Sequence, residues 1–412
     1  KDKGHEDVAS VFFDADKDGD LDLYVVSGGS EEKKGQYYQD RFYENLGDGE
    51  FLKAQAALPD FLNSGSCVKP GDFDNDGDLD LFVGGKLIPG NYPLPADSYL
   101  LKNESQGGNI KFVDVTKELA PFMTELGMVS DAEWVDVDND NNLDLVIVGE
   151  WMPIKIIKNT GSEFVDISKE SGLENQVGWW YSVACADFDK DGDKDFIVGN
   201  LGENYKYQAS PTEPFEVYAR DFDKSGSLDI VLGYHENGIA YPLRGRECSS
   251  NQMPFIKEKF PSYNDYGLAD MSTVYGKESL EKSLHYAATT FATSYIENLG
   301  GMKFNIQQID ALAQFSSVNS ILIDDFNKDG NLDVVLSGNL YQAEVETPRN
   351  DSGYGAFLEG NGKGGFKALF PNQSGLFVKG DVKNAAIINT PTNANKRIIF
   401  GKNDDEVQVV EY

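Results

Sequence analysis

The chain has 412 residues, 40% of them hydrophobic and 12% aromatic, so it can bury a sizeable core. Its formal net charge of −33 disfavours nucleic acid or an anionic membrane surface as a partner. No stretch approaches the roughly 18 apolar residues of a membrane span, so no transmembrane segment is expected. The three cysteines form no C-x-x-C pair, which leaves neither a disulfide framework nor a zinc signature.

The first motif along the chain is DADKDGDLD at residues 14–22, in which aspartate alternates with other residues. Alternating carboxylates on a tight loop supply the oxygens that Ca²⁺ binds, and Gly19 permits the sharp bend. An EF-hand would carry Glu at position twelve, but that position is Val25, and the flanks have the β-branched and aromatic composition of strands. The motif therefore predicts a metal loop between two strands, closed by Asp22 at position nine.

Five further copies of the motif follow, each with Asp at position nine and an apolar residue at position twelve. Six copies with the same strand flanks indicate an internal repeat. We expect up to six Ca²⁺ ions, held by positions one, three, five, seven and nine of each copy. These residues are Asp14, Asp16, Asp18, Asp20 and Asp22; Asp72, Asp74, Asp76, Asp78 and Asp80; Asp136, Asp138, Asp140, Asn142 and Asp144; Asp187, Asp189, Asp191, Asp193 and Asp195; Asp221, Asp223, Ser225, Ser227 and Asp229; and Asp325, Asn327, Asp329, Asn331 and Asp333.

The six loops are not expected to bind calcium equally. Ser225 replaces a carboxylate in the loop that begins at Asp221, and Asn327 replaces one in the loop that begins at Asp325. Because fewer charged ligands lower calcium affinity, we expect weaker binding at these two loops. The main role expected for the ions is structural, since each offsets carboxylate repulsion and adds its binding free energy to folding.

Most copies are followed by a second hairpin signal, such as FYENLGDGEF or IIKNTGSEF, so that one repeat supplies the four strands of a propeller blade. The sequence therefore predicts an all-β fold, a single β-propeller over 1–412 with seven blades or else six. A partly helical insertion is expected around 245–290. The repeats are expected near 8–60, 66–118, 128–170, 180–214, 215–310, 317–370 and 382–412, the last being degenerate.

These D-x-D-x-D-G-x-x-D loops between strands resemble the FG-GAP/VCBS repeat family, which includes the integrin α-chain propeller and many secreted bacterial proteins. The resemblance covers nearly the whole chain. It implies a β-propeller with calcium in the loop between the first two strands of a blade. It also implies a secreted or cell-surface location, where millimolar calcium would fill such loops. We expect this chain to be part of a longer secreted one.

Two sets of residues are candidates for ligand binding. Long loops after the second strands are rich in Tyr, Asn and Trp, and one of them contains Tyr205. Trp179 and Trp180 lie just before a central strand, near the same face, and are a candidate stacking platform for a sugar or peptide, with blade packing as the alternative. Arg244 and Arg246 belong to a basic island in this acidic chain. They form either internal salt bridges or a site for an anionic group such as a uronic acid.

No nucleophile or zinc-protease motif is present, and the sequence is not expected to encode an enzyme. The expected function is a monomeric, calcium-stabilised module that binds a protein or a glycan. One alternative is a calcium-dependent polysaccharide lyase, for which His235 is the candidate base. Another is a purely architectural domain of a larger surface protein.

Overall fold

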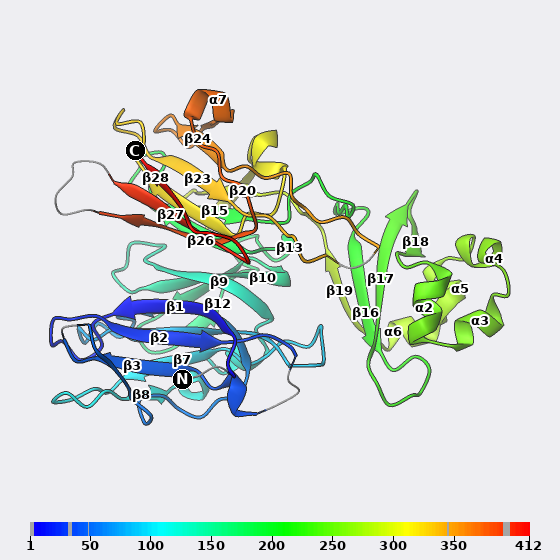
Figure 1. Cartoon of the computed structure of the whole chain (residues 1–412), viewed down its shortest axis with the longest axis horizontal. Helices are drawn as coiled ribbons and strands as arrows, with labels where there is room; N and C mark the ends of the chain where they lie inside the picture. The colour runs from blue at the N-terminus through cyan, green and yellow to red at the C-terminus, as the bar shows by residue number, and fades with distance from the viewer. Residues whose placement is uncertain (1–3, 32–34, 48, 344–345, 390–395) are drawn as a thin grey trace.

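The computed structural model describes residues 4–31, 35–47, 49–343, 346–389 and 396–412. These residues form seven antiparallel sheets with a few short helices, which confirms the all-β class (Figure 1). Six of the sheets are called blades one to six here, and the seventh belongs to an inserted unit. The blade strands alternate in side-chain direction and carry apolar residues on both faces, as expected for sheets packed on both sides.

The first three blades follow the chain strand by strand. Blade one contains β1 (Asp7–Phe13), β2 (Asp22–Ser27), β3 (Arg41–Asn45) and β4 (Phe51–Lys53). Blade two contains β5 (Ser64–Gly71), β6 (Asp80–Leu87), β7 (Tyr99–Asn103) and β8 (Phe112–Asp114). Blade three contains β9 (Met128–Val135), β10 (Asp144–Pro153), β11 (Lys155–Asn159) and β12 (Phe164–Asp166), and β13 (Val177–Trp179) pairs with the end of β10.

The remaining blades include one interrupted sheet and one sheet of three strands. Blade four contains β14 (Ser182–Ala186), β15 (Asp195–Gly199), β20 (Ser294–Asn298) and β21 (Phe304–Gln308). Blade five contains β22 (Ser320–Asp324), β23 (Asp333–Ser337), β24 (Ala356–Gly360) and β25 (Phe366–Leu369). Blade six contains β26 (Val382–Ile388), β27 (Arg397–Lys402) and β28 (Gln408–Glu411). Short helices α1 (Thr116–Leu119) and α7 (Pro371–Ser374) lie in connecting segments, as do 3-10 turns at Gln36–Tyr38, Pro121–Glu125 and Ala311–Gln314.

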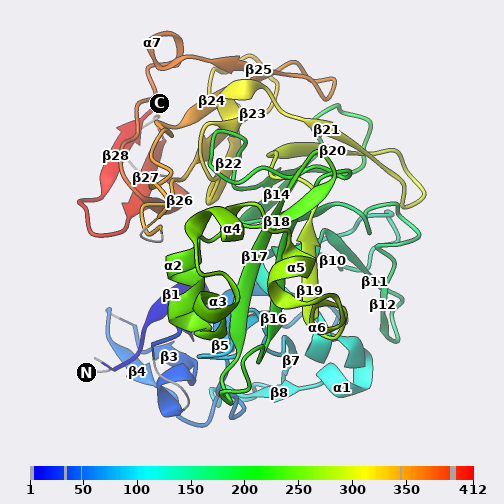
Figure 2. The same cartoon turned by 90° about the vertical axis from the view of Figure 1, so that its right-hand side faces the viewer.

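The six blades are arranged around a common axis, as in a β-propeller (Figure 2). Their first strands, or residues beside them, line a central cavity of about 400 Å³. Apolar side chains fill the space between neighbouring blades, as where Tyr24 and Phe42 of blade one pack with Leu81 of blade two. The core is thus divided into apolar layers between neighbouring blades. These layers hold the blades in place, and the blades in turn position the loops at both ends of their strands.

The inserted unit interrupts blade four between β15 and β20. Its sheet has the order β18-β17-β16-β19, with β16 (Phe215–Arg220), β17 (Asp229–Glu236), β18 (Ile239–Pro242) and β19 (Leu284–Ala288). Its helices, which match the helical insertion expected around 245–290, are α2 (Arg246–Gln252), α3 (Phe255–Lys259), α4 (Tyr263–Gly267), α5 (Met271–Tyr275) and α6 (Lys277–Glu281). They cover the outer face of the sheet (Figures 1 and 2).

The repeat boundary expected between 180–214 and 215–310 does not separate two blades. β15 pairs with β20 through Val198 and Ser294, so the third and fourth strands of blade four come from beyond the inserted unit. The loop that begins at Asp221 lies in the inserted sheet, between β16 and β17. The spacing of metal loops could not reveal this, because a metal loop marks any strand pair of this type and not only the start of a blade.

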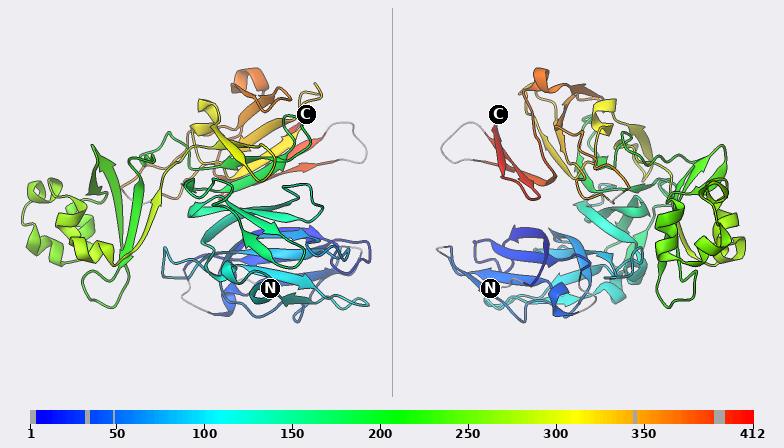
Figure 3. Two further views of the ribbon diagram at one scale, coloured as in Figure 1. Left: turned by 180° about the vertical axis from the view of Figure 1, so that it is seen from behind. Right: turned by 45° about the vertical axis from the view of Figure 1, so that its right-hand side comes forward.

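Blades one and six form the two ends of the arc (Figure 3). Their outward faces carry exposed apolar residues, since Phe12 is 55% and Ile388 is 41% exposed. Blade six is the degenerate repeat expected at 382–412, but most of its metal-type loop, 390–395, lies outside the described residues.

Candidate functional site: the metal loops and the cavity beside them

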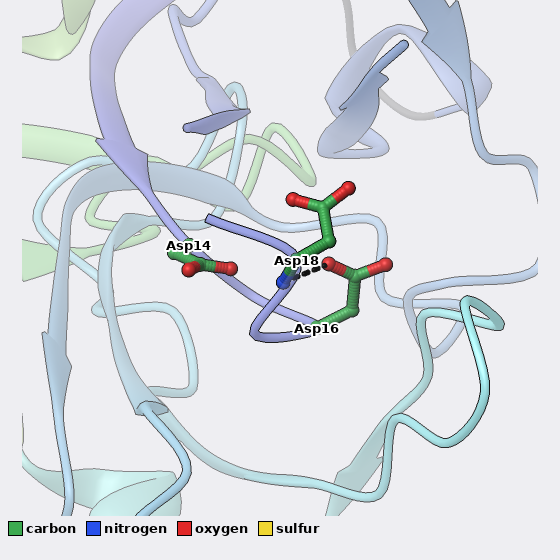
Figure 4. Close-up of side chains that lie close together, drawn as sticks. All are labelled: Asp14, Asp16 and Asp18. Carbon is green, nitrogen blue, oxygen red and sulfur yellow. Dashed lines mark hydrogen bonds between the residues drawn. The ribbon is translucent and has the colours of Figure 1, made fainter. Parts of the chain in front are cut away.

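The six metal loops are numbered here in chain order from their first residues, Asp14, Asp72, Asp136, Asp187, Asp221 and Asp325. In loop one, carboxylate oxygens of Asp14, Asp16 and Asp18 lie within 4.8 Å of one another (Figure 4). Such clusters occur in loops one to five and are formed by Asp14, Asp16 and Asp18; Asp72, Asp74 and Asp80; Asp136, Asp138 and Asp144; Asp187, Asp189 and Asp191; and Asp221, Asp223 and Asp229. Loop six, with Asn327 at position three, is not among the clusters of the described residues.

The loop backbone turns its own N–H groups toward the first carboxylate. In loop two, Asp76 N and Gly77 N donate to the two oxygens of Asp72 at 3.1 and 3.0 Å. Position six takes a positive φ, as Gly77 does at 88°. Asn141 occupies this position in loop three and adopts the same conformation, with φ at 69°. The substitution therefore keeps the loop shape, because Asn tolerates the left-handed region better than most residues.

The ninth aspartate ties each loop to its own sheet. Asp80 is fully buried, and its oxygens accept hydrogen bonds from Asn103 N at 2.8 Å and Phe73 N at 3.3 Å. Burial raises the pKa of Asp80 to about 7, against the opposing effect of these donors. The same pair of backbone bonds holds Asp22, Asp144 and Asp195. The ninth position therefore has a structural role beside any role as a metal ligand.

Several loop carboxylate oxygens fit a bound cation because nothing in the protein satisfies them. In the described structure, the Oδ1 atoms of Asp14, Asp20, Asp138, Asp187 and Asp193 are buried and have no hydrogen-bond donor. Buried anionic oxygens without a partner are costly, and a hard divalent cation is the partner that oxygen-only ligand sets favour. Loops one, three and four thus pass a test of fit that is independent of the sequence motif.

Two lysines that the sequence analysis missed also lie in metal loops. Lys102 of β7 contacts Asp74 and lies 3.2 Å from Asp76 in loop two. Lys158 of β11 contacts Asp138 and lies 3.2 Å from Asp140 in loop three. Both precede an Asn at the end of the third strand of a blade, where blades one and four have Glu44 and Glu297. This Lys-or-Glu position was the signal that could have found them.

The Asn that follows is a second residue type that was missed, and it clips one blade to the next. Asn103 Nδ2 donates to Ala15 O of loop one at 2.8 Å, and Asn159 Nδ2 donates to Phe73 O of loop two at 2.7 Å. Asn298 Nδ2 donates to Val137 O of loop three at 3.0 Å. Loops one to three are therefore part of the contacts between neighbouring blades.

A cavity of about 740 Å³ lies between the inserted unit and the loops at the other end of the blades. It brings together Trp179 and Arg244, two of the candidate ligand residues, from distant parts of the sequence. Tyr92 and Tyr207 add aromatic rings from two second-strand loops, and α2 contributes polar side chains that include Asn251 and Gln252. A mostly pre-formed concave site with aromatic walls and a few polar groups is typical of small-molecule binding.

Trp179 is held in place by other aromatic rings. Its ring centroid lies 5.0 Å from that of Trp151 and 5.4 Å from that of Phe291. Its backbone N–H donates to Asn200 Oδ1 at 3.1 Å, which anchors it at the root of the inserted unit. Trp179 therefore both packs the interface and forms a wall of the cavity, so the two alternatives from the sequence are not exclusive.

The other candidate ligand residues lie elsewhere. Trp180 is 1% exposed, and its Nε1 donates to Gln176 O at 3.3 Å inside the core, so it cannot meet a ligand. Tyr205 packs against Tyr207 behind the cavity wall. Arg246 Nε donates to Phe260 O at 2.6 Å, and its guanidinium stacks on Tyr263. The two adjacent tryptophans were expected to form one platform, but they point to different places. β13 pairs with β10 as far as Trp179, and the chain then turns into the core.

The basic island also includes Lys257 and Lys259, and most of its side chains bond to other residues of the inserted unit. Lys257 Nζ lies 2.9 Å from Glu247, and Lys259 Nζ donates to Val274 O at 3.0 Å. With Arg246 also bonded internally, Arg244 is the basic residue of the island that lines the cavity. Glu247 and Glu346 line it as well, so the structure favours a ligand of mixed polarity over a strongly anionic one.

His235, the candidate base of a lyase, is in the inserted sheet. Its Nε2 lies 3.0 Å from Glu216 Oε2, and His285 Nε2 lies 2.9 Å from the other oxygen of the same carboxylate. Although burial opposes it, these hydrogen bonds hold the pKa of Glu216 below its usual range. His235 does not line the 740 Å³ cavity.

Among the described residues, no helix combines the length and the apolar character needed to cross a membrane.

The FG-GAP-like repeat profile matches residues 8–83 and 136–198, and no curated protein matches the sequence. Among solved structures, Sqt1 of Saccharomyces cerevisiae is 12% identical with a TM-score of 0.40, covering 96% of this chain and 84% of that one. The V. cholerae biofilm matrix protein Bap1 is 10% identical with a TM-score of 0.29, covering 97% and 85%. Rhamnogalacturonan lyase YesW is 12% identical with a TM-score of 0.34, covering 99% and 72%. At these scores none of the three bears on function. The segments that hold loops one to four are FG-GAP-like repeats, which confirms the family resemblance inferred from the loops.

Proposed function

We propose that this chain is a calcium-stabilised extracellular β-propeller that binds a glycan, or a protein segment, in the 740 Å³ cavity beside the inserted unit. The observation that carries the proposal is the meeting of Trp179 and Arg244 in one cavity. An aromatic face with nearby amide, carboxylate and guanidinium groups suits a ligand that has both an apolar face and many hydroxyls, such as a sugar ring.

Calcium is the proposed ion because the loop donors are all oxygens and the ligand number is flexible. The Asp residues of loops one to five would hold it, and it would neutralise their repulsion. The extracellular location follows from the ion, since cytosolic calcium would leave loops of modest affinity empty.

The propeller is proposed to have seven blade positions. The seventh would be filled by a further four-stranded sheet between blades six and one. The support is the pair of exposed apolar faces that include Phe12 and Ile388. Completed in this way, the protein is expected to be a monomer. Sedimentation analysis tests this, because a concentration-dependent dimer of the present chain would instead indicate that a second copy covers these faces.

Binding is preferred to catalysis because His235 lies outside the cavity and is bonded to Glu216. The architectural alternative predicts no ligand at all. A glycan array and a peptide array, probed with the protein in millimolar calcium and again in chelator, separate the two. The protein is expected to bind a defined class of glycan. The absence of binding on both arrays would overturn the proposal.

Two variants locate the site once a ligand is found. Arg244→Ala and Trp179→Phe should each weaken binding at least tenfold, and a cooperative thermal transition checks that each variant is folded. Arg246→Ala is the matched control, because Arg246 has the same charge and lies two residues away but its side chain is bonded to Phe260 O and Tyr263. Equal losses in Arg244→Ala and Arg246→Ala would place the ligand outside the cavity.

A further inference from the structure

Loop five differs from the loops of blades one to four in what its ninth aspartate holds. In those blades, one oxygen of this residue accepts the backbone N–H of a third-strand residue, such as Asn103 for Asp80. In loop five, Asp229 Oδ1 instead accepts the side-chain Nε2 of Gln252 at 3.3 Å. Gln252 is the last residue of α2, so this loop is fastened to a helix and not to a neighbouring strand.

The same helix and the same strand form the cavity wall. Asp229 is the first residue of β17, and the three residues that follow it, Ile230, Val231 and Leu232, line the cavity. From α2, Glu247, Cys248, Asn251 and Gln252 line it on another side. The metal loop is therefore continuous with one wall of the cavity and hydrogen-bonded to a second wall.

Loop five also has the donor set of a cation site with moderate affinity. Oxygens of Asp221, Asp223 and Asp229 lie within 4.8 Å of one another, while positions five and seven are Ser225 and Ser227. Fewer carboxylates mean weaker calcium binding than in loops with five aspartates. Its occupancy would then change over a calcium range in which the stronger loops stay filled.

We propose that loop five is a calcium-responsive element that controls the ligand cavity through Asp229 and Gln252. Calcium in the loop fixes the Asp229 carboxylate, which then holds Gln252 and keeps the C-terminal turn of α2 against β17. By thermodynamic linkage, a ligand that needs α2 in this position tightens calcium at loop five by the same factor. This inference rests on the proposed function in taking the cavity as the ligand site and calcium as the ion of loop five.

Hydrogen exchange of the full chain tests the coupling with calcium alone as the probe. At constant millimolar calcium, amides of α2 are expected to exchange about threefold to tenfold faster in Asp223→Asn than in the wild type. This variant removes one carboxylate charge from loop five, which lowers its calcium affinity, but leaves Asp229, Gln252 and the other five loops intact. The matched control is Asp74→Asn in loop two, where α2 should exchange at the wild-type rate.

Gln252→Met separates the link from the ion. It keeps the length of the side chain but cannot donate to Asp229, so loop five should still be protected by calcium while the protection of α2 is lost. The coupling is overturned if α2 exchanges equally in the wild type and Asp223→Asn, or if Gln252→Met retains the protection. If the coupling is observed but neither the glycan array nor the peptide array shows binding, the proposed ligand-binding function is wrong and the coupling stands.

Discussion

Loops one and four have nearly the same sequence motif as loops two and three but a different electrostatic balance. In loops two and three, Lys102 and Lys158 enter the cluster of carboxylates from the third strand. Loops one and four have Glu44 and Glu297 at that strand position, and each retains two buried carboxylate oxygens without a donor. Loops two and three thus each contain a lysine ammonium, whereas loop three retains one such oxygen, that of Asp138, and loops one and four retain two each.

Outside the buried ninth position, the shifts in the carboxylate pKa values follow this division. Burial, a hydrogen bond with Asp191 and neighbouring like charges raise the pKa of Asp193 in loop four to about 6. In loop two, a backbone hydrogen bond from Asp78 and the Lys102 ammonium lower the pKa of Asp76, although burial opposes them. We therefore expect calcium affinity to depend on the residue before the clipping Asn on the third strand as well as on the aspartate motif.

Removal of calcium gives the largest expected effect. If loops one and four are filled to about 100 times their dissociation constants, each ion adds about 2.7 kcal/mol to the free energy of unfolding. Chelation should therefore lower the melting temperature by roughly 5 to 10 °C. Scanning calorimetry in millimolar calcium and in chelator measures this, and an unchanged melting temperature would contradict a structural role for the ions.

Exchanging the charge at the third-strand position tests the comparison directly. Glu297→Lys should lower the calcium affinity of loop four about tenfold or more, because the new ammonium competes for the same carboxylates. Lys102→Met should raise the affinity of loop two by a similar factor. Titration calorimetry measures both.

Lys111→Met is the matched control for the second change, since Lys111 is in blade two but pairs with Glu104 away from the loop. If all three variants bind calcium as the wild type does, the two classes of loop do not exist.

Mutation of the Asn residues that bond to a neighbouring blade should have a smaller effect on stability. It tests the blade-to-blade hydrogen bond that loops with and without a lysine have in common. Asn103→Ala should lower the free energy of unfolding by about 1–3 kcal/mol, because it leaves the Ala15 carbonyl of blade one without its donor. Asn45→Ala should cost less, since among the described residues Asn45 Nδ2 bonds to Leu21 O of its own blade and to no other blade. Denaturant unfolding measures both, and equal losses would show that the contact between blades adds nothing.

A pH effect at loop four is the smallest. The pKa of Asp193 is about 6 in the folded, calcium-free protein and about 3.9 in an unfolded chain. The folded state therefore holds more protons, so the stability from this group is complete below about pH 4 and is lost as the pH rises through 6. Because Asp193 is partly exposed, the change should be under about 1 kcal/mol.

Urea unfolding without calcium at pH 5.0 and 7.5, in the wild type and in Asp193→Asn, isolates this effect. The variant should lose less stability than the wild type between the two pH values. A loss of equal size in both proteins would show that Asp193 titrates normally.

The sequence was a good guide where one local pattern determines one local structure. The D-x-D-x-D-G-x-x-D spacing predicted all six loops and their flanking strands, because the oxygens, the bend and the strands lie within one short, continuous segment. It could not predict that Asn103 reaches Ala15 or that Lys102 reaches Asp74. Those contacts depend on how neighbouring sheets and strands are stacked, which no single segment encodes.

The inserted unit was misassigned for a related reason. Asp229 follows Asp195 too closely for the four strands of a blade, which indicates an irregular boundary. The motif of loop five is nevertheless like the others, so it does not show that the loop belongs to another sheet. Trp179 and Arg244 could be named as candidates from composition, but only the fold brings them into one cavity. Trp180 shows the opposite case, in which a residue of the right type is turned into the core.

The interruption of blade four has a consequence for the order of folding. Its middle strands, β15 and β20, pair through Val198 and Ser294, with the whole inserted unit between them in the chain. The other blades pair strands that are close in sequence, whereas blade four must close a long loop before its central pairing forms. Because loop closure costs entropy and non-local pairing is slow, blade four should be the last blade to assemble. The arc of blades would then form in two parts, blades one to three and blades five to six, which are joined when blade four is completed.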